Sequence, residues 1–252
     1  MKKNLVAGNW KMYKTPQESI SFAKNLKEGI KTYNDRDILI CPPFTSLFPV
    51  YDVLRGTPIK LGAQNVYFEE EGAFTGEIST RMLKESGVSY VICGHSERRN
   101  IFMETDEVIN KKIKKTISDG MTAILCIGEK LEERENGETF NIIKKQIYGC
   151  LNGINHIENI VIAYEPVWAI GTGKNATPEQ AEEVHFFIRE LIEKSFGKES
   201  AEKILILYGG SVKPENIDSL MAQKDIDGVL VGGASLKIES FLRIIDYNTS
   251  KI

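Results

Sequence analysis

Eight short apolar runs, each followed by a segment with helical periodicity, constrain the fold of this 252-residue chain more than any other feature. The runs are rich in β-branched residues, and they are continuous rather than alternating in polarity. This pattern is typical of strands that are buried on both faces of a parallel sheet. We expect these strands at Leu5–Ala7, Asp37–Cys41, Ile59–Leu61, Tyr90–Cys93, Thr122–Ile127, Ile160–Tyr164, Ile204–Tyr208 and Gly228–Val231.

Two helix starts are marked by capping boxes in which proline occupies the first helical position, at Thr15 and at Thr177. The amphipathic stretches that they open extend to about Thr32 and Phe196. Further helical patterns cover Ser46–Leu54, Ser79–Glu85, Asp106–Ser118, Glu138–Leu151, Pro214–Ala222 and Ile238–Tyr247. A helix is therefore expected after every strand.

This alternation predicts an α/β protein with a parallel sheet, because parallel neighbours need crossovers of about a dozen residues or more. A chain of about 250 residues has the usual size of a (β/α)8 barrel. A doubly wound open sheet is the alternative with the same pattern. Because no linker, repeat or shift in composition divides the chain, we expect residues 1–252 to form a single barrel domain.

Charge and hydropathy exclude several classes of partner. The formal net charge is −3 and there is no basic tract, so the chain lacks the electrostatic footprint expected of a nucleic-acid or membrane-surface binder. No apolar run approaches the ~20 residues of a membrane span. The apolar residues Leu5–Ala7 near the start are too few for a signal peptide, and we expect a cytoplasmic protein.

The four cysteines, Cys41, Cys93, Cys126 and Cys150, are far apart and form no CxxC pair. We expect them to be reduced and structural, since a buried thiol behaves as a small hydrophobe. No spacing of His, Cys or carboxylate residues suggests a metal site, and no cofactor is expected. A G-x-G-x-x-A match at Gly171–Ala176 lies several residues past its strand and does not directly open a helix, so nucleotide binding is disfavoured.

Polar residues and glycine pairs follow the expected strands, where a barrel of this kind places its chemistry. Because the carboxyl ends of all eight strands meet at one rim, we interpret these residues as one set. The glycine pairs let backbone N–H groups approach an oxyanion. The set comprises Asn9 and Lys11; Gln64 and Asn65; His95, Ser96 and Glu97; Glu165; Gly209, Gly210 and Ser211; and Gly232 and Gly233. His156 and His185 fall away from these ends, and we expect structural roles for them.

The segment Pro166–Ala176 directly follows Glu165 and ends before the capping box at Thr177. It contains two glycines and no regular pattern, which indicates a loop that can close over a site. A carboxylate beneath such a loop is suited to act as a general base, because desolvation raises its basicity.

Five segments, spread over the whole chain in order, resemble signatures of the triosephosphate isomerase family. They are Gly8–Met12, Gly94–Arg99, Tyr164–Lys174, Tyr208–Val212 and Gly232–Ser235. The resemblance implies a TIM barrel that interconverts dihydroxyacetone phosphate and glyceraldehyde 3-phosphate through an enediolate, without a cofactor, in glycolysis and gluconeogenesis.

The resemblance also implies a role for each residue of the predicted site. Glu165 would move the proton between two carbons, His95 would donate a hydrogen bond as neutral imidazole, and Lys11 would offset negative charge. Asn9 would orient Lys11. The phosphate would be held mainly by backbone N–H groups of Gly171, Ser211, Gly232 and Gly233.

The stretch from Gln64 to Glu77 resembles the family's third loop, which reaches into a second subunit. Its aromatic residues Tyr67 and Phe74 need apolar cover, so we expect a homodimer.

Three alternatives remain open at the level of the sequence. A sugar-phosphate epimerase would need clustered His and Asp metal ligands, and a Schiff-base aldolase would need a lysine at a strand end opposite the phosphate loops; neither is evident. A noncatalytic protein, either a sugar-phosphate sensor or a structural barrel, could keep the same fold. The trio Lys11, His95 and Glu165 argues against such a protein, and a turnover assay separates it from an enzyme.

Overall fold

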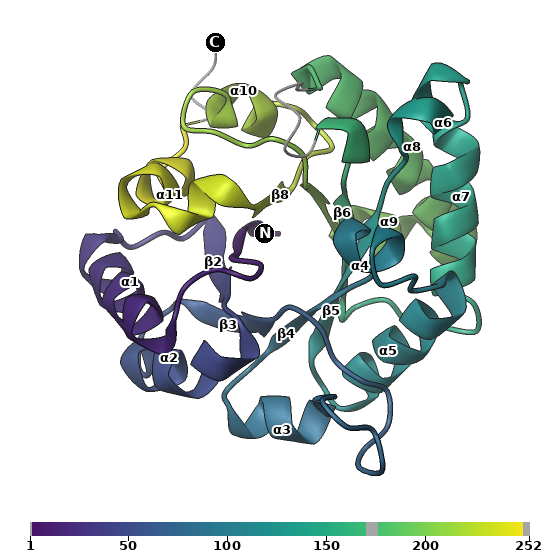
Figure 1. The fold of residues 1–252 in the computed structure, drawn as a ribbon. Coiled ribbons are helices and arrows are strands. Elements are labelled where there is room, and N and C mark those ends of the chain that lie inside the picture. Colours follow the sequence, from purple (N-terminus) through teal and green to yellow (C-terminus); the bar gives the residue numbers. More distant parts are fainter. Residues whose placement is uncertain (1, 170–175, 249–252) are drawn as a thin grey trace.

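Eight parallel strands close into a barrel in sequence order, with helices around the outside (Figure 1). The computed structural model describes residues 2–169 and 176–248. The closed order confirms the predicted (β/α)8 barrel and excludes the doubly wound open sheet. The strands are β1 (Asn4–Asn9), β2 (Arg36–Cys41), β3 (Lys60–Ala63), β4 (Tyr90–Cys93), β5 (Thr122–Ile127), β6 (Ile160–Tyr164), β7 (Leu205–Tyr208) and β8 (Gly228–Val231).

The helices that cover the barrel begin and end close to the predicted positions. They are α1 (Pro16–Gly29), α2 (Leu47–Leu54), α3 (Thr80–Glu85), α5 (Asp106–Ser118), α7 (Thr139–Cys150), α8 (Pro178–Phe196), α10 (Ile217–Met221) and α11 (Ile238–Ile245). The sequence did not predict the short helices α4 (Ser96–Asn100), α6 (Leu131–Glu135) and α9 (Lys198–Lys203), or the 3-10 turns η1 (Phe44–Ser46), η2 (Val167–Ala169) and η3 (Gly233–Leu236). Within the described chain, no helix is both long and apolar enough to cross a membrane.

Both predicted capping boxes are present. The hydroxyl of Thr15 accepts the N–H of Glu18, whose carboxylate accepts the N–H of Thr15, and Thr177 pairs with Gln180 in the same way. Helix α1 ends at Gly29 rather than near Thr32, because the next residue, Ile30, already has extended backbone angles.

The strands are apolar on both faces because each face packs against a different core. Along β1, Leu5 and Ala7 point into the barrel, whereas Val6 between them points outward and packs beneath the helices. Strand β2 repeats the pattern, with Leu39 inside and Ile40 outside. This arrangement explains the continuous apolar runs in the sequence and confirms the interpretation of strands buried on both faces.

Four strands differ from their predicted bounds. Strand β2 begins one residue earlier, at Arg36, and β7 begins one residue later, at Leu205. Strand β3 begins one residue later than expected and continues to Ala63, because Gly62 and Ala63 pair with Tyr90 and Val91 of β4. Strand β1 runs on to Asn9, which pairs with the last residue of β2. All four cysteines are buried and unpaired, as the sequence predicts.

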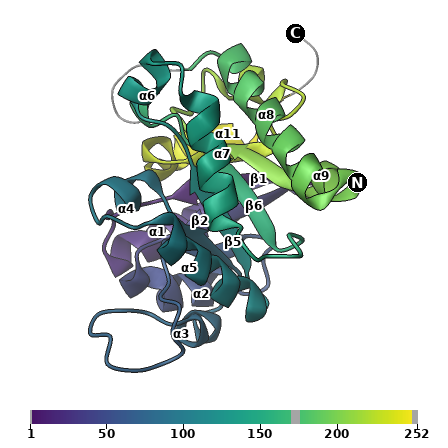
Figure 2. The ribbon, with the colours of Figure 1, turned by 90° about the vertical axis from the view of Figure 1, so that its right-hand side faces the viewer.

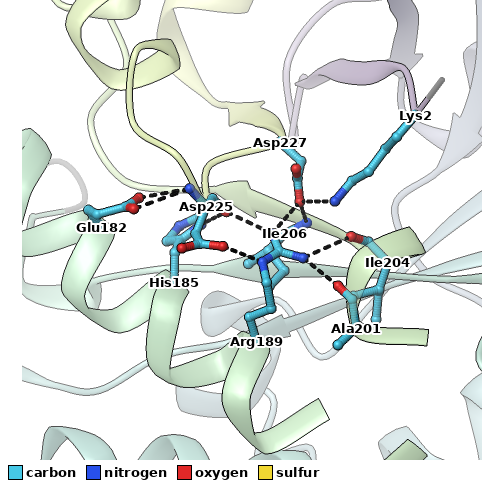
Figure 3. Close-up of polar contacts among 9 residues, drawn as sticks. All are labelled: Lys2, Glu182, His185, Arg189, Ala201, Ile204, Ile206, Asp225 and Asp227. Carbon is cyan, nitrogen blue, oxygen red and sulfur yellow. Dashed lines mark hydrogen bonds and ion pairs between the residues drawn. The ribbon is translucent and has the colours of Figure 1, made fainter. Parts of the chain in front are cut away.

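A polar cluster ties α8 to the chain around β7 and β8 (Figure 3). The guanidinium of Arg189 donates to the carboxylates of Asp225 and Asp227, with Nη2 2.7 Å from Oδ2 of Asp227, and also to the carbonyl of Ala201 at 2.6 Å. Lys2 adds an ion pair to Asp227 at 2.8 Å. The cluster lies at the amino ends of the strands, because Asp227 directly precedes β8.

Candidate active site

A cavity of about 500 Å³ opens at the carboxyl ends of the strands. The described residues to which the resemblance assigns a role all line it: Asn9, Lys11, His95, Glu165, Ser211, Gly232 and Gly233. Of the other polar and glycine residues predicted at the rim, Gly209 and Gly210 line the cavity, whereas Gln64, Asn65, Ser96 and Glu97 do not. The remaining residue with an assigned role, Gly171, lies outside the described residues, as does most of Pro166–Ala176, the loop predicted to close over the site. Residues from five separate strand ends therefore meet at one site, as the sequence predicted for a barrel.

Successive side chains along a strand point to opposite faces, and this alternation directs two of the site residues into the cavity. Asn9 is in register with the inward-facing Leu5 and Ala7 of β1, and Glu165 is in register with the inward-facing Ala163 of β6. Both side chains are therefore presented at the barrel mouth by the same geometry that fills its interior. Asn9 is 5% exposed and Glu165 is 2% exposed.

His95 reaches the cavity after a break in the strand geometry. Strand β4 stops at Cys93, because the next residue, Gly94, has φ of +72°, a left-handed conformation that favours glycine. His95 then caps α4, with its Nδ1 accepting the N–H of Glu97 at 3.2 Å. Because Nδ1 accepts a hydrogen bond, the proton of the neutral ring lies on Nε2. That nitrogen is 3.2 Å from Oε1 of Glu165.

Both carboxylate oxygens of Glu165 are engaged. Oε1 faces His95, and Oε2 accepts the backbone N–H of Ser96 at 2.9 Å. The Cys126 thiol packs beneath, where its burial and then the nearby Glu165 carboxylate raise its pKa well above the usual value. The thiol therefore remains protonated beside the carboxylate, and it places no second negative charge there.

Lys11 has a strained backbone that several contacts hold in place. Its φ is +51°, a region that costs a residue with a side chain about 1 kcal/mol or more and is often found at functional sites. Its N–H donates to Oδ1 of Asn9 at 3.0 Å, and its carbonyl accepts from Gln64 at 2.8 Å. Its ammonium pairs with Glu97 at 2.6 Å. Asn9 and Gln64 thus aim the Lys11 side chain at the cavity.

The glycine pairs form the far wall of the cavity. The chain after β7 is held against β6 by a hydrogen bond of 2.7 Å from the N–H of Gly209 to the carbonyl of Tyr164. After β8, Gly232 lies so close to Lys11 that a Cβ on it would be 3.6 Å from Cε of the lysine. A positive side chain and bare backbone are therefore adjacent, an arrangement suited to an oxyanion.

One functional candidate was missed in the sequence. Glu129 is completely buried, and its Oε1 accepts from Tyr164 at 3.1 Å, from Trp168 at 2.9 Å and from Arg134 at 3.2 Å. It therefore anchors the start of the loop that follows Glu165. An acidic residue two positions past the end of the fifth strand was the available signal.

Metal coordination has little support in the described part of the chain, where no three His, Cys, Asp or Glu side chains form a group that could hold an ion. His156 is largely exposed, and His185 is buried in α8 between Tyr164 and Tyr208. Both histidines lie away from the cavity, as expected.

A closed barrel of eight parallel strands with a polar cavity at their carboxyl ends defines a (β/α)8-barrel enzyme, the class whose active sites lie at that end. The model of one family of that class, described as triosephosphate isomerase, matches residues 4–248. The chain belongs to the triosephosphate isomerase family, and it is accordingly an enzyme of the isomerase class.

Curated relatives carry the same name. The chain is 57% identical over 247 residues to the triosephosphate isomerase of Carboxydothermus hydrogenoformans, a match that covers 97% of this chain and 98% of the relative. It is 54% identical to that of Endomicrobium trichonymphae and 52% identical to that of Geotalea uraniireducens, each match covering 98% of this chain and the whole relative.

Proposed function

We propose that this cavity interconverts dihydroxyacetone phosphate and D-glyceraldehyde 3-phosphate through an enediolate, without a metal or an organic cofactor. The observation that carries the proposal is the approach of His95 and Glu165 to 3.2 Å in a cavity that Lys11 also lines. A base, a hydrogen-bond donor and a cation are the groups that enolisation of a phosphorylated ketone requires.

Glu165 serves as the base in this proposal. Its carboxylate takes the proton from C1 of the ketone, the electron pair moves to the carbonyl oxygen, and the same carboxyl group returns the proton to C2. Ser96 donates to Oε2 of the carboxylate and His95 lies 3.2 Å from Oε1, so the carboxylate gives up its bond to Ser96 when it takes the proton. The low exposure of Glu165 keeps water from competing for the proton.

His95 stabilises the oxygens between which the enediolate charge is shared. The hydrogen bond from Glu97 to Nδ1 leaves Nε2–H as the donor, directed at the space beside Glu165. A neutral imidazole can therefore donate to the two substrate oxygens in turn while the proton on one passes to the other.

Lys11 and the glycine loops receive the phosphate. The ammonium offsets charge on the phosphate and on the enediolate, and its ion pair with Glu97 prepositions it. We assign phosphate contacts to the backbone at Ser211, Gly232 and Gly233, which line the cavity, and to Gly171, which the structure does not describe.

A homodimer is part of the proposal. The loop between β3 and α3 extends away from the barrel (Figure 2), and its rings contact one another, with the Tyr67 and Phe74 centroids 4.7 Å apart and their planes tilted by 44°. Phe74 remains 39% exposed, and Met12, next to Lys11, is 94% exposed. A second copy of the chain would cover both side chains. Because Met12 adjoins Lys11, assembly would then help to hold the lysine of the site in place.

The proposal also includes the domain organisation and the cellular location of the protein. We assign residues 1–252 to one catalytic domain, because residues from strands throughout the barrel line one cavity. The cytoplasm is the location that we infer, since it is where glycolysis and gluconeogenesis use these triose phosphates. Neither nucleic acid nor a membrane is needed as a partner.

The direct test is an isomerisation assay on purified protein that has been treated with EDTA and dialysed. We expect dihydroxyacetone phosphate to be converted at the rate of the untreated protein. A folded protein without turnover would reject the proposal in favour of a sugar-phosphate sensor. Activity that is lost with EDTA and restored by a divalent ion would reject the cofactor-free mechanism.

A further inference from the structure

The side-chain amide of Gln146 forms a two-point clamp on one glycine. Gln146 lies on α7, and its Oε1 accepts the N–H of Gly128 at 2.8 Å while its Nε2 donates to the carbonyl of Gly128 at 3.0 Å. Gly128 is the first residue after β5. The glutamine thus pairs with both backbone polar groups of this residue, as a neighbouring strand would, and it fixes the position and the rotation of the loop.

The clamped glycine is in direct contact with the backbone of Glu165. A Cβ built on Gly128 would lie 1.7 Å from the carbonyl oxygen of Glu165, so only a hydrogen fits between the two segments. The residues on each side of Gly128 hold the same stretch of chain: Ile127 accepts the N–H of Glu165 at 2.7 Å, and Glu129 accepts the N–H of Val167 at 3.1 Å. The backbone of Glu165 therefore rests on the segment that Gln146 fixes.

A second cavity, of about 180 Å³, has Gly128, Gln146 and Glu165 all on its wall. Because open space packs fewer atoms against Gly128 than a filled core would, the two hydrogen bonds from Gln146 contribute directly to holding it in place.

We propose that Gln146 is a positioning residue for the general base and that it acts through Gly128 on the backbone of Glu165. The inference rests on the proposed role of Glu165 and adds to it a residue that does not line the substrate cavity. A displacement of about 1 Å in a positioned catalytic group can cost on the order of 100-fold in rate. Release of the clamp should therefore slow proton transfer while leaving the phosphate contacts intact.

The main variant is Gln146→Met, which keeps the volume of the side chain and removes both hydrogen bonds. We expect kcat to fall about 10- to 100-fold, with KM and the inhibition constant of inorganic phosphate each within about 2-fold of the parent. The primary isotope effect with dihydroxyacetone phosphate deuterated at C1 should rise, because proton transfer then limits the rate. A residue that only stabilises the fold would change none of these kinetic quantities.

A second variant, Gln146→Glu, keeps an acceptor for the N–H of Gly128 but cannot donate to its carbonyl when ionised. Because a carboxylate oxygen then faces the carbonyl of Gly128 with no proton between them, we expect a loss of kcat in this variant as well, and it carries the test if the methionine variant does not fold. The matched control is Asn4→Leu, which removes a side-chain amide hydrogen bond to Tyr247 at the opposite end of the barrel. It should lower Tm without lowering kcat.

Two outcomes would overturn the inference: a folded Gln146→Met enzyme with the kcat and isotope effect of the parent, or a fully active Gln146→Glu enzyme. A Glu165→Gln variant, measured alongside, separates this failure from that of the proposed function. If Glu165→Gln keeps its activity, the base has been misassigned. If Glu165→Gln is inactive and both Gln146 variants are fully active, only the positioning role of Gln146 fails.

Discussion

Ser96 donates its backbone N–H to Oε2 of Glu165 at 2.9 Å, and this bond joins the first residue of α4 to the carboxylate that follows β6. The same carboxylate faces His95 through its other oxygen. The helix that His95 caps therefore holds the carboxylate of the proposed base. Because this bond fixes the group that moves the proton, while Lys11 and the glycine loops receive the phosphate, small shifts of Glu165 should change catalysis more than binding.

Gly209→Ala tests how little room Glu165 has. A methyl group at this position would lie 2.8 Å from Cγ of Glu165 and 3.2 Å from the carbonyl of Tyr164, so the carboxylate must move. We expect kcat to fall on the order of 10- to 100-fold with little change in Tm. Steady-state kinetics and thermal melting measure the two quantities. An unchanged kcat would mean that the position of Glu165 tolerates the added methyl group.

The fold and most of the site were predictable because both follow from local pattern. Residues buried on two faces leave continuous apolar runs, and polar residues just past those runs, such as Asn9 and Glu165, must gather at one rim once the strands are parallel. Helices opened by capping boxes were also located well, since the caps at Thr15 and Thr177 are specific sequence signals.

The parts that could not be predicted depend on contacts between distant segments. Helices α4, α6 and α9 have five or six residues, too few to show a helical period. The late end of β3 at Ala63 depends on pairing with β4 rather than on apolar character. The contacts of Gln146 with Gly128 and of Glu129 with Trp168 join residues 18 and 39 positions apart, and neither leaves a motif.

Thr75→Arg tests the proposed dimer. Thr75 is exposed in the single chain, in the loop that carries Phe74, and an arginine there would bring an unpaired charge into the proposed interface. We expect a monomer by light scattering, with turnover that falls on dilution. Thr32→Arg, at an exposed threonine just beyond α1, is the matched control and should stay dimeric. A monomeric Thr75→Arg enzyme with full activity would break the link between assembly and catalysis.

His185 predicts a pH dependence of stability. Burial is the main cause that lowers its pKa from 6.5 to about 4, and Nε2 has no hydrogen-bond partner among the described residues. The unfolded chain therefore binds a proton that the folded chain excludes. The free energy of unfolding should be unaffected by His185 above pH 6.5 and fall by about 1.4 kcal/mol for each pH unit between 6.5 and 4.

Urea unfolding at fixed protein concentration, compared between the parent and His185→Gln, measures this dependence. We expect the variant to lose less stability than the parent between pH 6.5 and 4.5, each relative to its own value at pH 7.5. Among the described residues, the hydrogen bond of the ring is to the carbonyl of Asp225 (Figure 3), and His185 does not line the cavity, so the substitution should not alter it. Parallel curves for the two proteins would show that His185 is not excluded from protonation in the folded state.

The most direct measurement is the kcat and KM of Glu165→Asp with dihydroxyacetone phosphate, beside those of Glu97→Asp. The shorter side chain withdraws the proposed base by about 1 Å, and we expect kcat to fall on the order of 100-fold while KM changes by only a few fold. Glu97→Asp, which alters the carboxylate paired with Lys11, should lose much less. A Glu165→Asp enzyme with nearly full kcat, together with a large loss in Glu97→Asp, would transfer the role of base to Glu97 and contradict the mechanism.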